Sequence, residues 1–257
     1  MTITINDLLK GKGTIIKGKE YLSTEAYVTP FLERMSKFTD DFRVQVKLPD
    51  QVTLTKNNDI KLEDQTFNRV NVEAILPDEY AFEGHKRVVG FVYALDTRKP
   101  IVKQYVGAIR SACLNLCVFN PDALQVQELV PETTINYSFL NNCLSMTDST
   151  NLILKQLSEK EYTKEECYQN LGTWVDNVIN TPFTNGFGKV KLSESLPIEA
   201  YKNLFYNDKS EYFHKETDIV TGFDIYNSFT DLICNGSRPD IANRFEKTYL
   251  VSKILGI

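Results

Sequence analysis

The stretch RVVGFVYALDTRKPIVKQYVGAIR, residues 87–110, decides the fold. Apolar, β-branched and aromatic residues dominate both of its ends, and the segment Asp96-Thr-Arg-Lys-Pro100 between them has the composition of a turn. Runs of this kind and length are typical of β-strands. The stretch therefore predicts two antiparallel strands joined in a hairpin.

Similar runs extend the pattern towards the N-terminus. Segments with alternating or β-branched residues occupy positions 42–48, 51–56 and 67–76, with turn residues at Pro49-Asp50, Asn57-Asn58-Asp59 and Pro77-Asp78. Before them, Thr29 and Pro30 have the composition of an N-cap and a first helical residue, which predicts a short helix there. An antiparallel meander of about five strands fits this half best.

The C-terminal half has helical periodicity instead. Ile135, Phe139 and Cys143 are spaced as one helical face, and Cys167, Leu171, Val175 and Val178 as another. Residues 184–191 have loop composition, and further helices are expected from Ser195 and Pro197, from Thr217 or Asp218 to Cys234, and from Ser237–Asp240 through Ile241, Phe245 and Tyr249. We predict an α+β protein whose N-terminal sheet packs against a helical C-terminal half.

Charge is divided unevenly between the two halves. The chain has 29 basic and 34 acidic side chains, a net charge of −5, which excludes a nucleic-acid-binding protein held by bulk charge. Residues 1–130, the β-rich region, are neutral, so the acidic excess lies in the helical region, residues 131–257. No repeat or low-complexity linker separates the regions, and we expect one compact unit.

The predicted hairpin is the one strongly basic segment of the sequence. Its cations alternate with aromatic rings, a combination suited to single-stranded nucleic acid, since lysine and arginine bind phosphates and rings stack on bases. The predicted binding residues are Lys86, Arg87, Arg98, Lys99, Lys103, Arg110, Phe91, Tyr93 and Tyr105, with the lysine-rich segment Lys10–Lys19 closing over the strand. The alternative is an ordinary edge hairpin, with solubilising cations and buried rings.

Other motifs give no basis for catalysis. Gly13–Glu20 nearly matches a phosphate-binding loop, but Glu20 replaces the required hydroxyl residue, and a flexible lysine-rich arm is the better interpretation. The only histidines, His85 and His214, lack metal-ligand spacing, and no serine lies in a GxSxG motif. We expect no catalytic residue, metal or cofactor, and the chain is more easily interpreted as a non-enzyme.

Composition also bears on the compartment. The opening MTITINDLLK lacks the apolar stretch of a secretory signal, and no run reaches the length of a transmembrane helix. The cysteines are odd in number, Cys113, Cys117, Cys143, Cys167 and Cys234, which favours reduced thiols. These features predict a cytoplasmic protein without membrane contact, residing in the cytoplasm of a host cell if it comes from a phage.

The segment Val88–Phe119, with Gly107, Arg110, Cys113 and Asn115 in a GxxRxxCxN motif, resembles an uncharacterised phage and plasmid protein family of mobile elements. The segments Tyr21–Met35 and Phe223–Ile233 are similar to its helix entry and its late helix. The resemblance implies a role in mobile-element DNA metabolism or in conflict with the host. From the residues themselves, Gly107 suits a close backbone approach, Arg110 a phosphate or buried carboxylate, and Asn115 a turn.

Two functional hypotheses follow. The first is a non-enzymatic accessory protein of a phage or plasmid that binds single-stranded DNA, in its more specific form a homo-oligomeric annealing or recombination factor. The second is a phage protein-binding module that uses the acidic helical half, either to inhibit a host defence factor or as a virion component. The overall charge favours the second hypothesis, but the basic hairpin makes the first the preferred one, with the second as its alternative.

Overall fold

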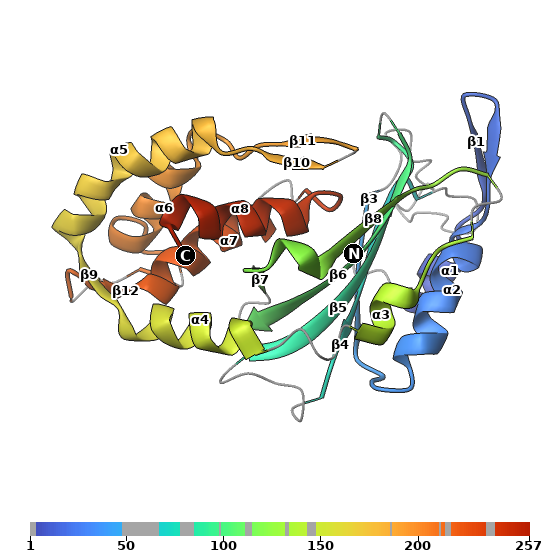
Figure 1. Cartoon of the computed structure of the whole chain (residues 1–257), viewed down its shortest axis with the longest axis horizontal. Helices are drawn as coiled ribbons and strands as arrows, with labels where there is room; N and C mark the ends of the chain where they lie inside the picture. The colour runs from blue at the N-terminus through green and yellow to red at the C-terminus, as the bar shows by residue number, and fades with distance from the viewer. Residues whose placement is uncertain are drawn as a thin grey trace, which may run out of the picture. The chain divides into compact units, whose positions relative to one another are not determined.

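The computed structural model describes residues 4–47, 67–77, 85–97, 99–110, 115–131, 134–142, 148–185, 187–210, 212–213, 217–234 and 240–257 (Figure 1). The chain forms two compact units and crosses between them several times. Unit 1 consists of Met1–Ala81, Lys86–Val106 and Ala123–Leu144, and unit 2 of Phe82–His85, Gly107–Asp122 and Ser145–Ile257. The division therefore does not fall at one point near residue 130.

An antiparallel sheet forms the centre of unit 1. Its strands lie in the order β3, β4, β5, β6, with β8 paired to the first half of β6, while the end of β6 and its partner β7 belong to unit 2. The bounds are β3 (Phe42–Lys47), β4 (Arg69–Ile75), β5 (His85–Ala94), β6 (Ile101–Arg110), β7 (Leu116–Cys117) and β8 (Leu124–Glu128), the last preceded by a 3-10 turn, Pro121–Ala123. The predicted α+β class and N-terminal sheet of about five strands are confirmed. The strand expected at 51–56 lies outside the described residues.

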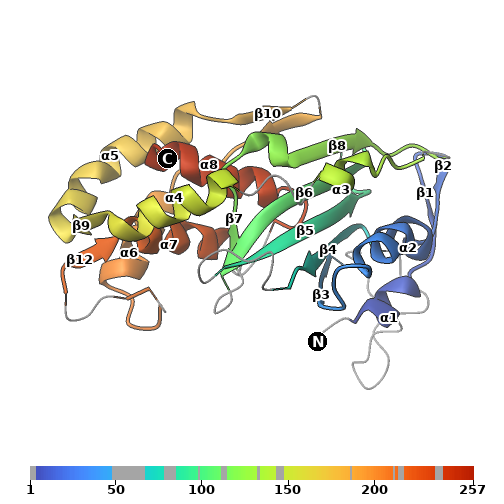
Figure 2. The same ribbon diagram turned by 60° about the horizontal axis from the view of Figure 1, so that its bottom comes forward.

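The apolar face of this sheet is covered by helix α2 (Thr24–Met35). Figures 1 and 2 show α2 and α3 (Ser138–Asn142) on the same side of the sheet. The ring of Phe31 stacks on Phe91 of β5 with centroids 5.4 Å apart, and Tyr27 lies 5.6 Å from Tyr93. The helix that packs on the sheet thus comes from the N-terminal half. The remaining elements of unit 1 are α1 (Ile5–Leu9), β1 (Thr14–Ile16) and β2 (Lys19–Tyr21).

Helix α2 begins six residues earlier than the sequence pattern predicts, at Thr24 instead of Pro30. Ser23 is the N-cap, and its Oγ accepts a hydrogen bond from the Ala26 N–H at 3.3 Å. Pro30 therefore lies inside the helix, where proline usually costs about 3 kcal/mol. The prediction of a start at Pro30 is wrong because Tyr27 and Val28, which precede it, are buried and their burial favours extending the helix.

Unit 2 contains most of the helical residues. Its helices are α4 (Asp148–Glu159), α5 (Lys164–Asn180), α6 (Leu196–Phe205), α7 (Gly222–Cys234) and α8 (Arg244–Leu255). Two short antiparallel pairs accompany them, β9 (Glu161–Thr163) with β12 (Ile219–Thr221) and β10 (Phe183–Asn185) with β11 (Gly188–Val190). Helix α8 is buried around most of its circumference, polar Glu246 and Thr248 included, so it is the central helix of this unit.

Some boundaries in unit 2 differ from the predictions. The segment 184–191, expected as a loop, contains most of the antiparallel pair of β10 (Phe183–Asn185) and β11 (Gly188–Val190). Helix α7 ends at Cys234 as predicted but begins at Gly222, because Thr221 and Asp224 form its capping hydrogen bonds, 3.1 Å from Asp224 N–H to Thr221 Oγ1. Helix α8 begins at Arg244, after a turn in which Asp240 accepts from the Asn243 N–H. No helix in the described part of the chain is long and apolar enough to cross a membrane.

Candidate binding groove

The three aromatic rings of the predicted nucleic-acid hairpin are all buried. Phe91, Tyr93 and Tyr105 are 0%, 2% and 1% exposed. Phe91 and Tyr93 face α2, where the Tyr93 hydroxyl lies 2.7 Å from Thr24 Oγ1 and burial raises its pKa. The prediction that these rings are available to stack on bases is wrong, because the sheet uses them for its own core.

Tyr105 belongs to a polar cluster on the opposite face of the sheet. Its hydroxyl donates to Glu73 Oε1 at 2.6 Å and lies 3.1 Å from Asn71 Oδ1. Arg43 Nη1 lies 3.8 Å from the other Glu73 oxygen. Glu73 and Asn71 are fully buried, so the hydrogen bonds of this cluster offset the cost of burying polar groups.

Two of the predicted phosphate-binding cations are also buried. Arg87 is 5% exposed and Lys103 is 2% exposed, and both interact with other parts of the protein. Neither charge is accessible to a nucleic-acid backbone, so their assignment as binding residues is corrected. The sequence pattern does not reveal this, because long cationic side chains at strand positions are normally exposed.

The other cations of the hairpin give a weaker basic surface than expected. Lys86 is half-buried, and exposed Lys99 has its Nζ 3.9 Å from Glu128 Oε2. Arg98 and the side chain of Arg110 lie outside the described part of the structure. Within the described residues, the hairpin therefore presents one well-exposed lysine and no exposed ring.

The GxxRxxCxN motif has a structural role at the positions that are described. A Cβ on Gly107 would lie 2.7 Å from Leu116 Cδ1 and 3.1 Å from the Cys117 carbonyl, which is the close approach expected for this glycine. Asn115 is fully buried, and its Nδ2 donates to the Tyr212 hydroxyl at 2.7 Å. Asn115 thus connects distant segments of unit 2, beyond the turn expected of it, while Cys113 lies outside the described residues.

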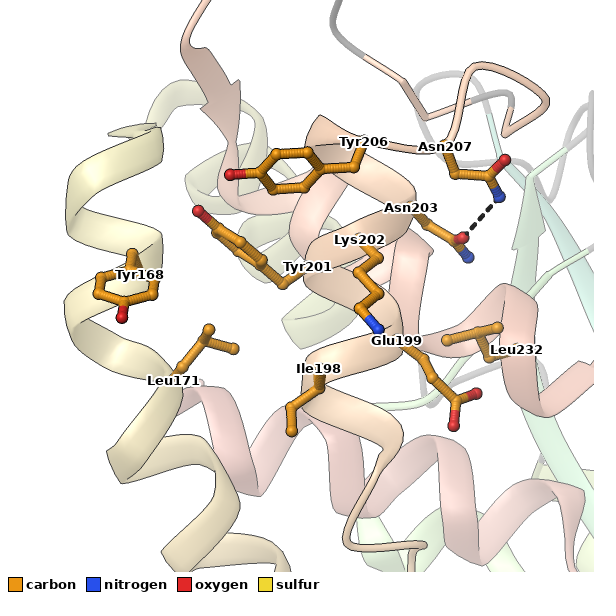
Figure 3. Close-up of a pocket in the computed structure, with 10 residues that line it drawn as sticks. All are labelled: Tyr168, Leu171, Ile198, Glu199, Tyr201, Lys202, Asn203, Tyr206, Asn207 and Leu232. Atoms are coloured by element: carbon orange, nitrogen blue, oxygen red, sulfur yellow. Dashed lines mark hydrogen bonds between the residues drawn. The ribbon is translucent and has the colours of Figure 1, made fainter.

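A groove between α5 and α6 is the candidate functional site (Figure 3). It has a volume of about 710 Å³ and is open to solvent. Residues three and four apart in a helix lie on the same face, and residues with this spacing form each wall. The lining residues are Tyr168 and Leu171 of α5, Ile198, Glu199, Tyr201, Lys202 and Asn203 of α6, Tyr206 and Asn207 after it, and Leu232 of α7.

The local sequence determines both walls. Helix α5 starts at a capping box in which Thr163 Oγ1 accepts from the Glu166 N–H at 3.2 Å and Glu166 Oε2 accepts from the Thr163 N–H at 2.7 Å. These hydrogen bonds lower the pKa of Glu166. Helix α6 starts after Ser195, with Pro197 in its first turn, as the sequence predicts. Both helices that carry the groove tyrosines Tyr168 and Tyr201 therefore have starts encoded in their own sequence.

Three tyrosines form its most prominent feature. The Tyr201 ring lies 6.2 Å from that of Tyr168 and 5.9 Å from that of Tyr206, each at a tilted angle. Tyr201 is 7% exposed, whereas Tyr168 and Tyr206 are 62% and 63% exposed. Burial, with a further contribution from the Tyr206 hydroxyl, raises the pKa of Tyr201 to about 12. The set is a fixed inner ring flanked by two accessible ones.

Charged and polar side chains also contribute to the lining, Glu199 and Lys202 among them. Lys164 Nζ lies 4.4 Å from the centre of the Tyr206 ring and 5.7 Å from that of Phe205, a cation–π arrangement. Figure 3 shows the Asn207 side chain bonded to Asn203, with a distance of 2.9 Å. Ile198, on the α6 wall, is an exposed apolar residue that also lines the groove.

Sequence reasoning missed this groove although a signal for it exists. The segment YKNLFY, residues 201–206, has three aromatic residues in six positions, and Tyr168 follows an acidic run that resembles a solvated helix face. The two segments are more than thirty residues apart, and helical periodicity alone does not show that α5 and α6 are neighbours. Their contact is a tertiary feature.

The chain is an α+β protein with a solvent-open, largely apolar groove in its helical unit. Among the described residues, no group of three or more histidine, cysteine or acidic side chains is arranged to hold a metal ion. In comparisons with known proteins, no family model, curated protein or solved structure matches this chain. The resemblance to the phage and plasmid family stays a prediction.

Proposed function

We propose that this protein is a non-enzymatic accessory protein whose α5–α6 groove binds an apolar segment of a partner protein. The proposal rests on one observation, that several exposed apolar side chains lie together in one groove. Tyr168, Ile198 and Tyr206 are 62%, 45% and 63% exposed and all line it. Exposed apolar residues are normally scattered, and their clustering in a concave surface is typical of an interaction site.

Charge indicates the chemistry of the partner. Unit 2 has 18 acidic and 13 basic side chains and so contains the whole net charge of −5. Glu199 lines the groove, and Glu165 lies close enough to contribute to the raised pKa of Tyr201. Complementary charge favours a segment in which basic residues flank an apolar or aromatic anchor. A host defence factor or a virion protein would be the partner if the mobile-element resemblance holds.

The same charge makes the groove less suitable for nucleic acid. Stacking of bases on tyrosines is favourable only where cations also neutralise the phosphates. Here Lys164 and Lys202 are opposed by Glu165 and Glu199 within a unit that is acidic as a whole. A protein segment therefore fits the groove better than a single strand.

Labelled peptides test this function. We would compare three peptides that share leucine and phenylalanine anchors but have lysine, serine or glutamate flanks, and measure binding to the full chain by fluorescence anisotropy. The lysine-flanked peptide should bind most tightly, because its anchors fill the groove and its flanks match the charge of unit 2. Ile198→Ser should weaken that binding at least about fivefold, since it removes an apolar contact.

Ile179→Ser is the matched control. Ile179 lies on α5 and is 43% exposed, close to the 45% of Ile198. It does not line the groove. Its substitution should leave peptide binding unchanged. Absence of binding by all three peptides, or equal losses in both variants, would overturn the proposal. Binding of a labelled oligonucleotide that Tyr168→Ser abolishes would favour single-stranded nucleic acid as the ligand instead.

A further inference from the structure

A second surface, in unit 1, has features of a different binding site. Strands β1 and β2 form a hairpin that projects from α1 and α2 in both views (Figures 1 and 2). We call residues Lys10–Tyr21 the basic arm. Its base is fixed, because Tyr21 is 4% exposed and a Cβ on Gly13 would lie 2.5 Å from the Tyr21 carbonyl oxygen. Its outer part is exposed, and a Cβ on Gly18 would contact nothing within 4 Å.

The turn of the arm contains an unfavourable residue. Lys17 has φ +51°, the one non-glycine residue with positive φ in the described part of the chain, and Gly18 follows with φ +75°. A two-residue hairpin turn with positive φ at both positions favours asparagine or aspartate before the glycine. Lysine is a poor choice there for folding, and an unfavourable backbone conformation retained at an exposed position points to a role for the side chain.

The charge of the arm supports the same role. Lys12, Lys17 and Lys19 are all exposed, and Glu20 is the one acidic residue between Gly11 and Tyr21. Lys17 and Lys19 form no ion pair with any residue that the structure describes. Unit 1 is neutral overall, with 16 basic and 16 acidic side chains, so the arm is a local concentration of positive charge.

An exposed apolar side chain accompanies these lysines. Ile15 is 71% exposed on β1, where it pairs with Glu20 and packs against no core. Lysine ammonium groups bind phosphates as point charges, and an adjacent apolar side chain can contact a sugar or an unpaired base. This combination suits a flexible single strand, whose bases are accessible, better than a folded acidic protein.

We propose that the basic arm binds the phosphate backbone of single-stranded nucleic acid, through Lys17 and Lys19 at its tip. This proposal does not depend on the α5–α6 groove, which lies in the other unit. It moves the predicted nucleic-acid contact from the β5–β6 hairpin, whose rings are buried, to a hairpin whose cations are accessible.

The test measures anisotropy of a labelled oligothymidylate of about 20 nucleotides with the full chain, over a series of salt concentrations. Affinity for a single strand falls with salt with a slope of about −0.7 per phosphate neutralised. The double variant Lys17→Asn with Lys19→Gln should therefore bind more weakly and reduce the slope by about 1.4. Lys17→Arg should retain the slope, because it keeps the charge.

Lys189→Gln is the matched control, since Lys189 is an exposed lysine on the other short hairpin, β10–β11. It should leave affinity and slope unchanged. The thermal midpoint of Lys17→Asn should equal or exceed that of the natural chain, because asparagine suits positive φ, so weaker binding by this variant would not reflect misfolding. The proposal is overturned if the natural chain does not bind at low salt, or if Lys189→Gln lowers the slope as much as the arm variants.

A vesicle measurement separates nucleic acid from an anionic membrane. Vesicles of phosphatidylcholine with about one-third phosphatidylserine present the same negative charge without bases, and exposed lysines bind such surfaces as well. Binding to the oligonucleotide in preference to these vesicles supports the proposal. Binding to the vesicles alone overturns it in favour of a membrane surface.

Discussion

The ring of Tyr105 occupies the space that a side chain on Gly90 would need. A Cβ at residue 90 would lie 2.0 Å from Tyr105 Cζ, well inside van der Waals contact. The same tyrosine is held by its hydrogen bond to Glu73, so the ring has little freedom to move aside. Gly90→Ala should lower the free energy of unfolding by about 1–3 kcal/mol, the usual cost of overpacking. Urea denaturation, monitored by circular dichroism, measures this change in the free energy of unfolding.

Gly172→Ala is the control for that substitution. Gly172 is an exposed position of helix α5, where a Cβ would meet nothing within 4 Å. Alanine should raise the free energy of unfolding by about 0.5–1 kcal/mol, because it lowers the conformational entropy of the unfolded chain and has higher helix propensity. Equal effects of the two substitutions would contradict the close contact between Gly90 and Tyr105.

Lys99 and Lys103 should respond differently to charge reversal. Lys103 is 2% exposed, so Lys103→Glu places a carboxylate in an environment built around a buried cation and should cost about 3 kcal/mol or more. Lys99 is well exposed, and Lys99→Glu should change stability by less than about 1 kcal/mol, because its ion pair with Glu128 is screened by water. Thermal unfolding of both variants distinguishes them. A stable Lys103→Glu variant would show that this side chain is accessible.

Asn115→Ala should destabilise the protein without affecting binding at the groove or the arm. The substitution removes the 2.7 Å hydrogen bond that Asn115 Nδ2 donates to the buried Tyr212 hydroxyl, at a typical cost of about 0.5–1.5 kcal/mol. The measurements are chemical denaturation together with the peptide and oligonucleotide assays. Loss of binding at unchanged stability would instead assign the GxxRxxCxN motif a direct functional role.

Stability should fall at alkaline pH. Burial, with a smaller effect of Glu166, raises the pKa of the Cys167 thiol from 9.0 to about 12. The folded state therefore keeps the proton while the unfolded state releases it, so this contribution is complete below pH 9 and is lost as pH rises towards 12. The slope from this one thiol is at most about 1.4 kcal/mol per pH unit.

Urea midpoints measured from neutral pH to pH 10 and above test this dependence. Burial also raises the pKa of Tyr137 to about 12, so the natural chain should lose stability with contributions from several groups. Cys167→Ala should show a shallower decline than the natural chain, although it is less stable at neutral pH because the thiol fills buried space. Equal pH dependence in the two chains would contradict a buried, protonated Cys167.

The sequence by itself determined the kind and the approximate position of the main elements. The runs at residues 42–48 and 67–76 and the hairpin at 87–110 became β3 to β6, and Cys167 to Val178 lie on α5. These features are local, because alternation of apolar residues and helical spacing report the backbone conformation of the segment that contains them. The start of α6 is local in the same way, because Pro197 in its first turn has a φ angle already suited to a helix.

Tertiary structure alone decided which side chains are accessible. Phe91 and Tyr93 are covered because α2 packs on that face, and Tyr105 and Lys103 are enclosed on the other, so a surface predicted for nucleic acid proved to be core. The groove exists because α5 and α6 bring Tyr168 and Tyr201 together from distant segments. A periodic pattern states which residues share a face but not what covers that face, since the covering element lies elsewhere in the chain.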